Sequence, residues 1–233
     1  MTLEEAIAKI RPLDHNAMEI AQKRWDGIAK PLHSLGKLET LLIQIAGITG
    51  NAEVDLSRRG LIAMCADNGV VEEGVTQTGQ EVTAIVAENF LKYDTSVGVM
   101  CKQNHAEIFP VDMGMVTDTK VRTDHKIAYG TQNMTKGPAM TREQAVKGLE
   151  AGIDMVRELN DKGYRILATG EMGIGNTTTS SAVASVLLKQ PVEEMTGRGA
   201  GLTSEGLVRK INAIKKAIAL NLSLIHISEP TRP

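Results

Sequence analysis

A glycine-rich stretch that contains one acidic residue has the composition and spacing best suited to chemistry in this sequence. It reads Gly-Glu-Met-Gly-Ile-Gly-Asn-Thr-Thr over residues 170–178, after an apolar run at 164–169 and before a helical pattern at 179–188. Glycines let the backbone approach a ligand closely, and the amides and dipole at a helix start favour an anion. We therefore expect a phosphate site here, with Glu171 handling a proton or a positive charge.

Two well-known phosphate motifs do not fit this stretch. The dinucleotide fingerprint needs a third glycine where Thr178 stands, and it belongs to the first strand of its domain rather than the third. The P-loop needs a Gly-Lys-Ser/Thr sequence, which does not follow. A dehydrogenase or another nucleotide-binding α/β protein is therefore a distant alternative.

Strand patterns alternate with helical patterns around the loop. The expected strands are short apolar runs at 60–66, 106–111 and 164–169, the second weakened by Pro110 and the third buried. Such alternation is typical of an α/β fold, here a Rossmann-like parallel sheet flanked by helices.

Helical patterns fill the intervals between these strands and also make up the N-terminus. Residues 1–50 show no strand pattern and form an expected small helical subdomain. The expected helices begin near Thr2, Asp14 and Ser34, and the later ones cover 81–92, 95–104 and 141–161, the last opened by a capping box at Thr141–Gln144.

Each expected strand leads to a carboxylate. Asp67 follows the first strand, Asp112 the second, and Glu171 follows the third after one glycine. Ligands bind at the carboxyl ends of parallel strands, so three carboxylates together favour a site. Alternatively, Asp67 and Asp112 cap loops by accepting backbone N–H groups. Gln80 ends a long polar loop and either reaches inward or contacts the following helix.

Composition narrows the range of functions. The 233 residues carry a net charge of −2, which gives no reason to expect a nucleic acid or membrane partner. Cys65 and Cys101 have no metal-ligand spacing, and we expect buried, reduced thiols. Without a signal-peptide pattern or an apolar stretch of membrane length, the expected location is cytoplasmic.

Several segments together resemble the nicotinate-nucleotide–dimethylbenzimidazole phosphoribosyltransferases of cobalamin biosynthesis. The 170–178 loop resembles that family's signature, and Ala66–Val75 is similar to its Asp-His-Gly-Val segment, with Asn68 in place of the commoner histidine. The other matching segments are Gln80–Thr83, Asn89–Leu91, Gly130–Asn133, Ala139–Thr141 and Gly197–Gly201.

The resemblance implies a reaction. Family members transfer the phosphoribosyl group of nicotinate mononucleotide to a ring nitrogen of 5,6-dimethylbenzimidazole, with inversion from β to α at the anomeric carbon. The products are α-ribazole 5′-phosphate and nicotinate. The resemblance implies no metal or other cofactor, and a homodimer for the full-length protein.

It also implies roles for particular residues. Glu171 supports catalysis near the reacting carbon, Gln80 lines the benzimidazole pocket, and Lys210 binds the phosphate, although spacing alone reads Lys210 as a solvated helix lysine. The expected substrate-binding set is Gln80, Asp67, Gly173, Ile174, Gly175, Asn176, Thr177, Thr178 and Lys210.

The sequence departs from the family at its C-terminal end. The family continues beyond residue 233, and its usual catalytic-base glutamate lies in that continuation. We expect a helical subdomain at 1–50, an incomplete α/β domain at 51–221, and an artefactual tail at 222–233, with a genuine divergent terminus as the alternative. A phosphate- or nucleotide-binding fragment without the catalytic base is the alternative function.

Overall fold

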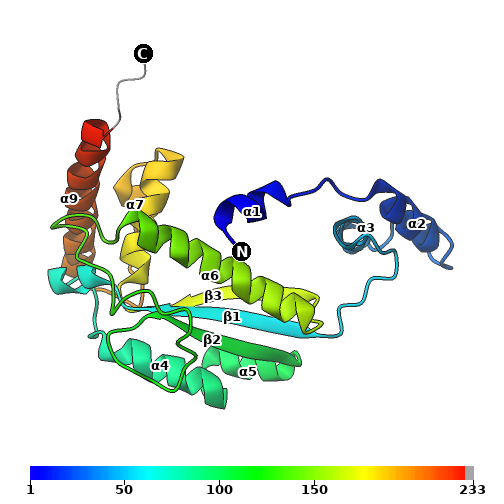
Figure 1. Ribbon diagram of the computed structural model, residues 1–233, viewed down its shortest axis with the longest axis horizontal. Coiled ribbons are helices and arrows are strands. Elements are labelled where there is room, and N and C mark those ends of the chain that lie inside the picture. Colours follow the sequence, from blue (N-terminus) through cyan, green and yellow to red (C-terminus); the bar gives the residue numbers. More distant parts are fainter. Residues whose placement is uncertain (229–233) are drawn as a thin grey trace.

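The centre of the molecule is a parallel sheet with three strands. The computed structural model describes the backbone of residues 1–228 and the side chains of residues 1–222. The strands are β1 (Arg59–Ala66), β2 (Ala106–Gly114) and β3 (Ile166–Met172), in the order β2-β1-β3 (Figure 1). Both pairs are parallel, which confirms the predicted α/β fold.

The strand order explains where proline and exposed positions fall. Pro110 pairs with Ala63 inside β2, and it is tolerated because an edge strand leaves some of its N–H groups unpaired. β3 is the other edge strand among the described residues, and Ile166 is 40% exposed. The prediction of a buried third strand was therefore wrong, because only β1 has a neighbour on each side.

Helices cover the two faces of the sheet. On one face, Ala63 and Cys65 pack against Ala84 and Phe90 of α4 (Glu81–Lys92), with α5 (Ser96–Gln103) beside it (Figure 1). On the other face, Ile62 packs against Met155 of α6 (Arg142–Asp161). The capping box at the start of α6 is confirmed, since Thr141 and Gln144 bond each other's backbone N–H groups.

The C-terminal helices form a third packed group. It consists of α7 (Asn176–Leu188), α8 (Val192–Met195) and α9 (Ser204–Ser228), together with a 3₁₀ turn at Gly69–Glu73. Val70 and Val75 of the loop after β1 pack against Ala182 of α7 and Ile214 of α9. This packing brings the loop after β1 next to the start of α7. Residues 229–233 of the expected tail lie outside the described residues.

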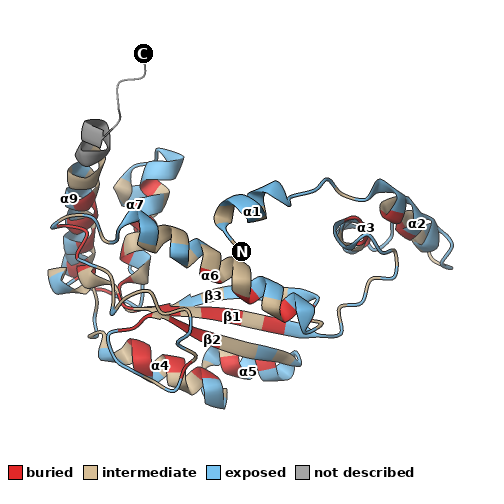
Figure 2. Ribbon diagram, viewed as in Figure 1, coloured by how far each residue is buried: buried red, intermediate tan, exposed pale blue. Residues whose placement is uncertain are grey.

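The N-terminal helices separate into two parts. The helix α1 (Leu3–Ala8) lies beside α6, where the amide of Leu3 donates to Glu150 (Figure 1). The helices α2 (His15–Asp26) and α3 (Lys37–Thr49) pack on each other, away from the sheet (Figure 2). Asp14 caps α2 as predicted, by accepting the N–H of Ala17.

The α2–α3 pair contains a buried ion pair at the turn between its helices. Lys30 Nζ lies 2.9 Å from a carboxylate oxygen of Glu39, and Glu39 is only 2% exposed. The same carboxylate accepts the N–H of Leu35 at 3.1 Å.

Within residues 1–228, no helix is long and apolar enough to cross a membrane.

Candidate functional site

The glycine-rich loop connects the end of β3 to the start of α7. A Cβ atom at Gly173 would overlap the carbonyl oxygen of Ala66, so the loop can approach β1 this closely only without a side chain. Gly175 has φ +91°, a left-handed conformation that glycine adopts without strain. Helix α7 then begins at Asn176, three residues earlier than the sequence pattern predicted.

Most amides of this loop are already hydrogen-bonded within the chain. The N–H groups of Asn176 and Thr178 donate to Gly173 O (3.0 Å) and Gly175 O (2.9 Å). The Asn176 side chain accepts the N–H of Thr177 at 2.7 Å. Among the described residues, none accepts the N–H of Gly175, and this glycine lines the cavity described below.

Lys210 extends from α9 to the glycine-rich loop. Its Nζ donates to Thr177 Oγ1 at 2.7 Å and to Gly197 O at 3.1 Å. The residue is 1% exposed, so the reading of Lys210 as a solvated lysine was wrong. Burial lowers its pKa, and no carboxylate of the described residues forms an ion pair with it. A buried ammonium group with only neutral partners is suited to bind an anion.

A cavity of about 280 Å³ opens between the loop and Lys210. Its lining consists of Val75, Thr76, Gln77, Thr78, Met172, Gly173, Ile174, Gly175, Asn176, Thr177, Arg198, Gly199, Ala200, Leu202 and Lys210. The guanidinium of Arg198, which the sequence analysis did not assign, donates to Leu202 O and Ser204 Oγ. These lining residues include two cations and no carboxylate, which favours an anionic ligand.

Asp67 and Asp112 are fully buried and bond to backbone N–H groups. Asp67 accepts the N–H of Val116 at 2.9 Å, and Asp112 accepts those of Gly114 and Met115 at 2.9 and 2.7 Å. Burial raises the pKa of Asp67, and Lys126 Nζ lies 3.1 Å from Asp112. These contacts support the loop-capping interpretation of both residues.

Glu171 lies apart from these two carboxylates. It occupies β3 rather than the turn after it, and it pairs with Met64, which packs on the α6 side of the sheet. Asp112 pairs with Cys65, which packs on the α4 side. All three carboxylates therefore lie near the carboxyl edge of the sheet, but Glu171 faces the side opposite to Asp112, because neighbouring residues of a strand point to opposite faces. Glu171 is exposed and does not line the 280 Å³ cavity.

Gln80 immediately precedes α4 and is half-buried. Its Nε2 donates to Asn68 O at 3.2 Å, so its side chain joins two parts of the loop after β1. Sequence reasoning also missed the contacts of Asn68 and Thr83 with the glycine-rich loop. Asn68 Nδ2 donates to Ile174 O at 3.1 Å, and Thr83 Oγ1 accepts the N–H of Ile174 at 3.0 Å.

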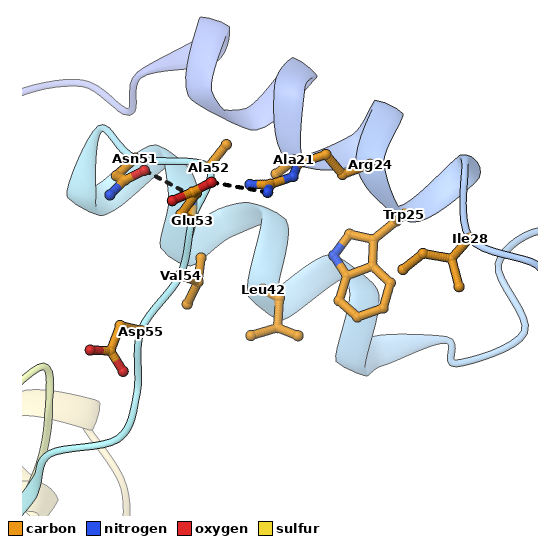
Figure 3. A pocket seen from close by; sticks show the side chains of 10 residues that line it. All are labelled: Ala21, Arg24, Trp25, Ile28, Leu42, Asn51, Ala52, Glu53, Val54 and Asp55. Carbon is orange, nitrogen blue, oxygen red and sulfur yellow. Dashed lines mark hydrogen bonds and ion pairs between the residues drawn. The ribbon is translucent and has the colours of Figure 1, made fainter.

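Two other cavities have a different character. One of about 520 Å³ lies between α2, α3 and residues 51–55, where Trp25, Ile28 and Leu42 form an apolar wall and Arg24 pairs with Glu53 (Figure 3). Another of about 650 Å³ lies beside α6 and is lined mainly by apolar groups, including Ile127, Met140 and Leu149. Neither has a buried cation comparable to Lys210.

The parallel sheet, the glycine-rich loop at a helix start and the buried lysine define an α/β protein with a candidate anion site. Residues 10–231 match a protein-family model described as "Phosphoribosyltransferase". The chain therefore belongs to this phosphoribosyltransferase family.

Individual relatives narrow the resemblance. The chain is 51% identical over 223 residues to the nicotinate-nucleotide–dimethylbenzimidazole phosphoribosyltransferase of Ruminiclostridium cellulolyticum, covering 95% of this chain and 63% of the relative. It is 49% identical over 223 residues to the enzyme of the same name from Clostridium acetobutylicum, with the same two coverages.

A solved structure agrees with these relatives. The crystal structure of CobT from Thermus thermophilus matches with a TM-score of 0.80 and 36% identity, covering 88% of this chain and 62% of that one. The chain thus spans a little under two thirds of the length of these relatives.

Proposed function

We propose that this chain belongs to an enzyme that transfers the phosphoribosyl group of nicotinate mononucleotide to 5,6-dimethylbenzimidazole. The products are α-ribazole 5′-phosphate and nicotinate, for the lower ligand of cobalamin. The observation that carries the proposal is Lys210, a buried cation without an anionic partner beside a glycine-rich helix start. The names of the relatives supply the substrate identities.

The proposed binding mode places the 5′-phosphate in the 280 Å³ cavity. The ammonium of Lys210 neutralises its charge, and the N–H of Gly175 donates to a phosphate oxygen. Lys210 Nζ donates to the hydroxyl oxygen of Thr177, and a phosphate oxygen can replace that hydroxyl as the acceptor. The proposed contacts of Asn176 and Thr178 need a rearrangement, since their N–H groups have partners in the chain. Ile174 contributes by lining the cavity while its N–H stays bonded to Thr83.

The chemistry requires carboxylates near the reacting carbon. Positive charge develops at the anomeric carbon as nicotinate leaves, and a carboxylate stabilises it. A second carboxylate removes the ring N–H proton of the attacking base. We propose Glu171 for a supporting role, which its exposed position on β3 allows. We propose that Asp67 acts through the shape of the binding loop, and that Gln80 lines the pocket of the benzimidazole.

A second function is favoured by the absence of carboxylates from the cavity lining. Among the described residues, the walls supply cations and amides but no group that accepts a proton at neutral pH. A nucleotide-binding unit without turnover therefore fits the same geometry, and the relatives extend well beyond the length of this chain.

One experiment separates the two functions. Residues 1–233 are incubated with nicotinate mononucleotide and dimethylbenzimidazole, and nicotinate release is measured alongside the full-length enzyme of R. cellulolyticum as a positive control. Release supports the transferase. Binding of the nucleotide in calorimetry without release supports the binding unit, and a folded chain that does neither contradicts both.

We further propose a cytoplasmic homodimer for the full-length protein, with a helical subdomain at 1–50, an α/β domain at 51–221 and a tail at 222–233 that is not native. The resemblance supports the homodimer, and light scattering of the full-length protein tests it. Genomic DNA downstream of codon 221 tests the tail.

A further inference from the structure

Both backbone polar groups of Ile174 are held by side chains from distant parts of the chain. Its N–H donates to Thr83 Oγ1 of α4 at 3.0 Å, and its carbonyl accepts from Asn68 Nδ2 at 3.1 Å. Ile174 lies between Gly173 and Gly175, which have no side chains that fix their conformation. The two contacts therefore restrain the most permissive part of the loop.

Asn68 also bonds to the helix that follows. Its Oδ1 lies 3.3 Å from Thr179 Oγ1, a hydroxyl that also reaches Asn176 O at 2.9 Å, so one amide group contacts the glycine-rich loop and the first turn of α7. Its own backbone is fixed, since Asn68 O accepts the N–H of Val71 at 3.1 Å and Gln80 Nε2 at 3.2 Å. Asn68 thus connects the loop after β1, the glycine-rich loop and α7.

Thr83 is fully buried, and its hydroxyl oxygen has one hydrogen-bond donor, the N–H of Ile174. The same hydroxyl counteracts the rise that burial causes in the pKa of Asp67, so it lies close to that buried carboxylate. Asp67 also accepts the N–H of Val116. The hydroxyl that fixes Ile174 is therefore held in a buried, polar part of the molecule, beside Asp67.

We propose, on the basis of the function proposed above, that Asn68 and Thr83 are positioning residues for phosphate binding. They hold Ile174 from both sides, so that Gly175 and Lys210 line one cavity before any nucleotide arrives. A loop that is fixed in advance loses less conformational freedom on binding, and this raises affinity.

The local effect is tested by amide hydrogen exchange at residues 173–179 of the 233-residue chain. Thr83→Val keeps the shape but removes the acceptor, and we expect exchange at Ile174 to be about 5- to 10-fold faster, the effect of one hydrogen bond. Thr83→Ser restores the hydroxyl and should restore protection. Asn68→Ala should accelerate exchange across the segment. Asn68→His supplies one donor and one acceptor nitrogen when neutral, and should retain protection.

Matched control variants separate this effect from general loss of stability. Thr135 is another buried threonine whose hydroxyl is bonded, to Glu73, and Asn104 donates to Met100 O on the exposed side of α5. Thr135→Val and Asn104→Ala should leave exchange at 173–179 unchanged. Unchanged exchange in Thr83→Val and Asn68→Ala would overturn the proposal. If Thr83→Val does not fold, the comparison of Asn68→Ala with Asn68→His decides by the same measurement.

Calorimetry with nicotinate mononucleotide then measures the consequence for binding. We expect the affinity of Thr83→Val and Asn68→Ala to fall about 5- to 10-fold, in parallel with the exchange, and that of Thr83→Ser to stay near wild type. If exchange accelerates but affinity stays the same, the positioning role is wrong. If the wild-type chain does not bind the nucleotide, the proposed function fails, and exchange alone still decides whether the two side chains fix the loop.

Discussion

Lys30 and Lys210 are both withdrawn from solvent, and their surroundings differ. Lys30 lies in the α2–α3 pair, where it forms an ion pair with Glu39 at 2.9 Å. Lys210 lies beside the glycine-rich loop, where its partners are a hydroxyl and a carbonyl. The charge of Lys30 is balanced inside the chain, so it contributes to folding. The charge of Lys210 is not balanced by any carboxylate of the described residues, which indicates a binding site for an anionic ligand.

The strongest test of this difference is the affinity for nucleotide of Lys210→Met. Loss of a charge-assisted contact to phosphate should weaken binding of nicotinate mononucleotide about 100-fold, measured by calorimetry. Lys215→Met is the matched control, because Lys215 lies on the same helix, is exposed and pairs with Glu193. If Lys210→Met binds the nucleotide as tightly as wild type does, Lys210 is not a phosphate ligand and the contrast with Lys30 is wrong.

A second test compares the stability of the ligand-free variants. Lys30→Met leaves the buried Glu39 without its cation, and we expect its unfolding midpoint to fall by several degrees. Trp25, the only tryptophan in the sequence, lies on α2 and reports this unfolding by fluorescence. Lys210→Met removes an unbalanced charge, so its midpoint should stay level or rise. A fall of similar size in both variants would show that the two lysines have equivalent roles.

A third test uses pH. Burial lowers the pKa of Lys210, so between this pKa and that of an unfolded lysine the unfolded chain binds more protons and stability rises with pH. Phosphate favours the ammonium form, so affinity should fall over the same range. We therefore expect nicotinate mononucleotide to bind more weakly at pH ~9.5 than at pH ~7, since an unfolded lysine titrates only at about 10.4. Lys210→Met should show no such dependence.

The smallest expected effect is that of an exposed ion pair. Arg24 and Glu53 lie 3.1 Å apart with side chains that are 52% and 76% exposed, and water screens such pairs strongly. Arg24→Met should therefore leave the Trp25 unfolding midpoint within about 1 °C of wild type. A shift as large as that of Lys30→Met would mean that burial does not distinguish the two pairs.

Local signals in the sequence identified most of the fold. Thr2, Asp14 and Thr141 cap helices where their side chains predicted, since a cap depends on residues only three positions away. The exposure of β3 depends instead on which strands lie beside it. No pattern within residues 164–169 contains that information.

The candidate site was predictable only in part, for the same physical reason. The glycine pattern located the loop, but the side of the sheet that Glu171 faces changes with a shift of one residue in the strand. The burial of Lys210 depends on packing between α9 and Thr177, which is 33 residues away in sequence. The contacts of Asn68 and Thr83 with Ile174 span still longer separations.

The burial of Cys65 makes its thiol a natural probe of how often the sheet opens. It lies at the end of β1 with no exposed surface, and burial, with Asp112 and Asp67 nearby, raises the pKa of its thiol to about 12. Alkylating reagents attack thiolates, so this thiol should react only when the strand separates from α4. The rate at which Cys65 is alkylated in the native protein therefore measures how often the core opens, and the measurement needs no introduced label.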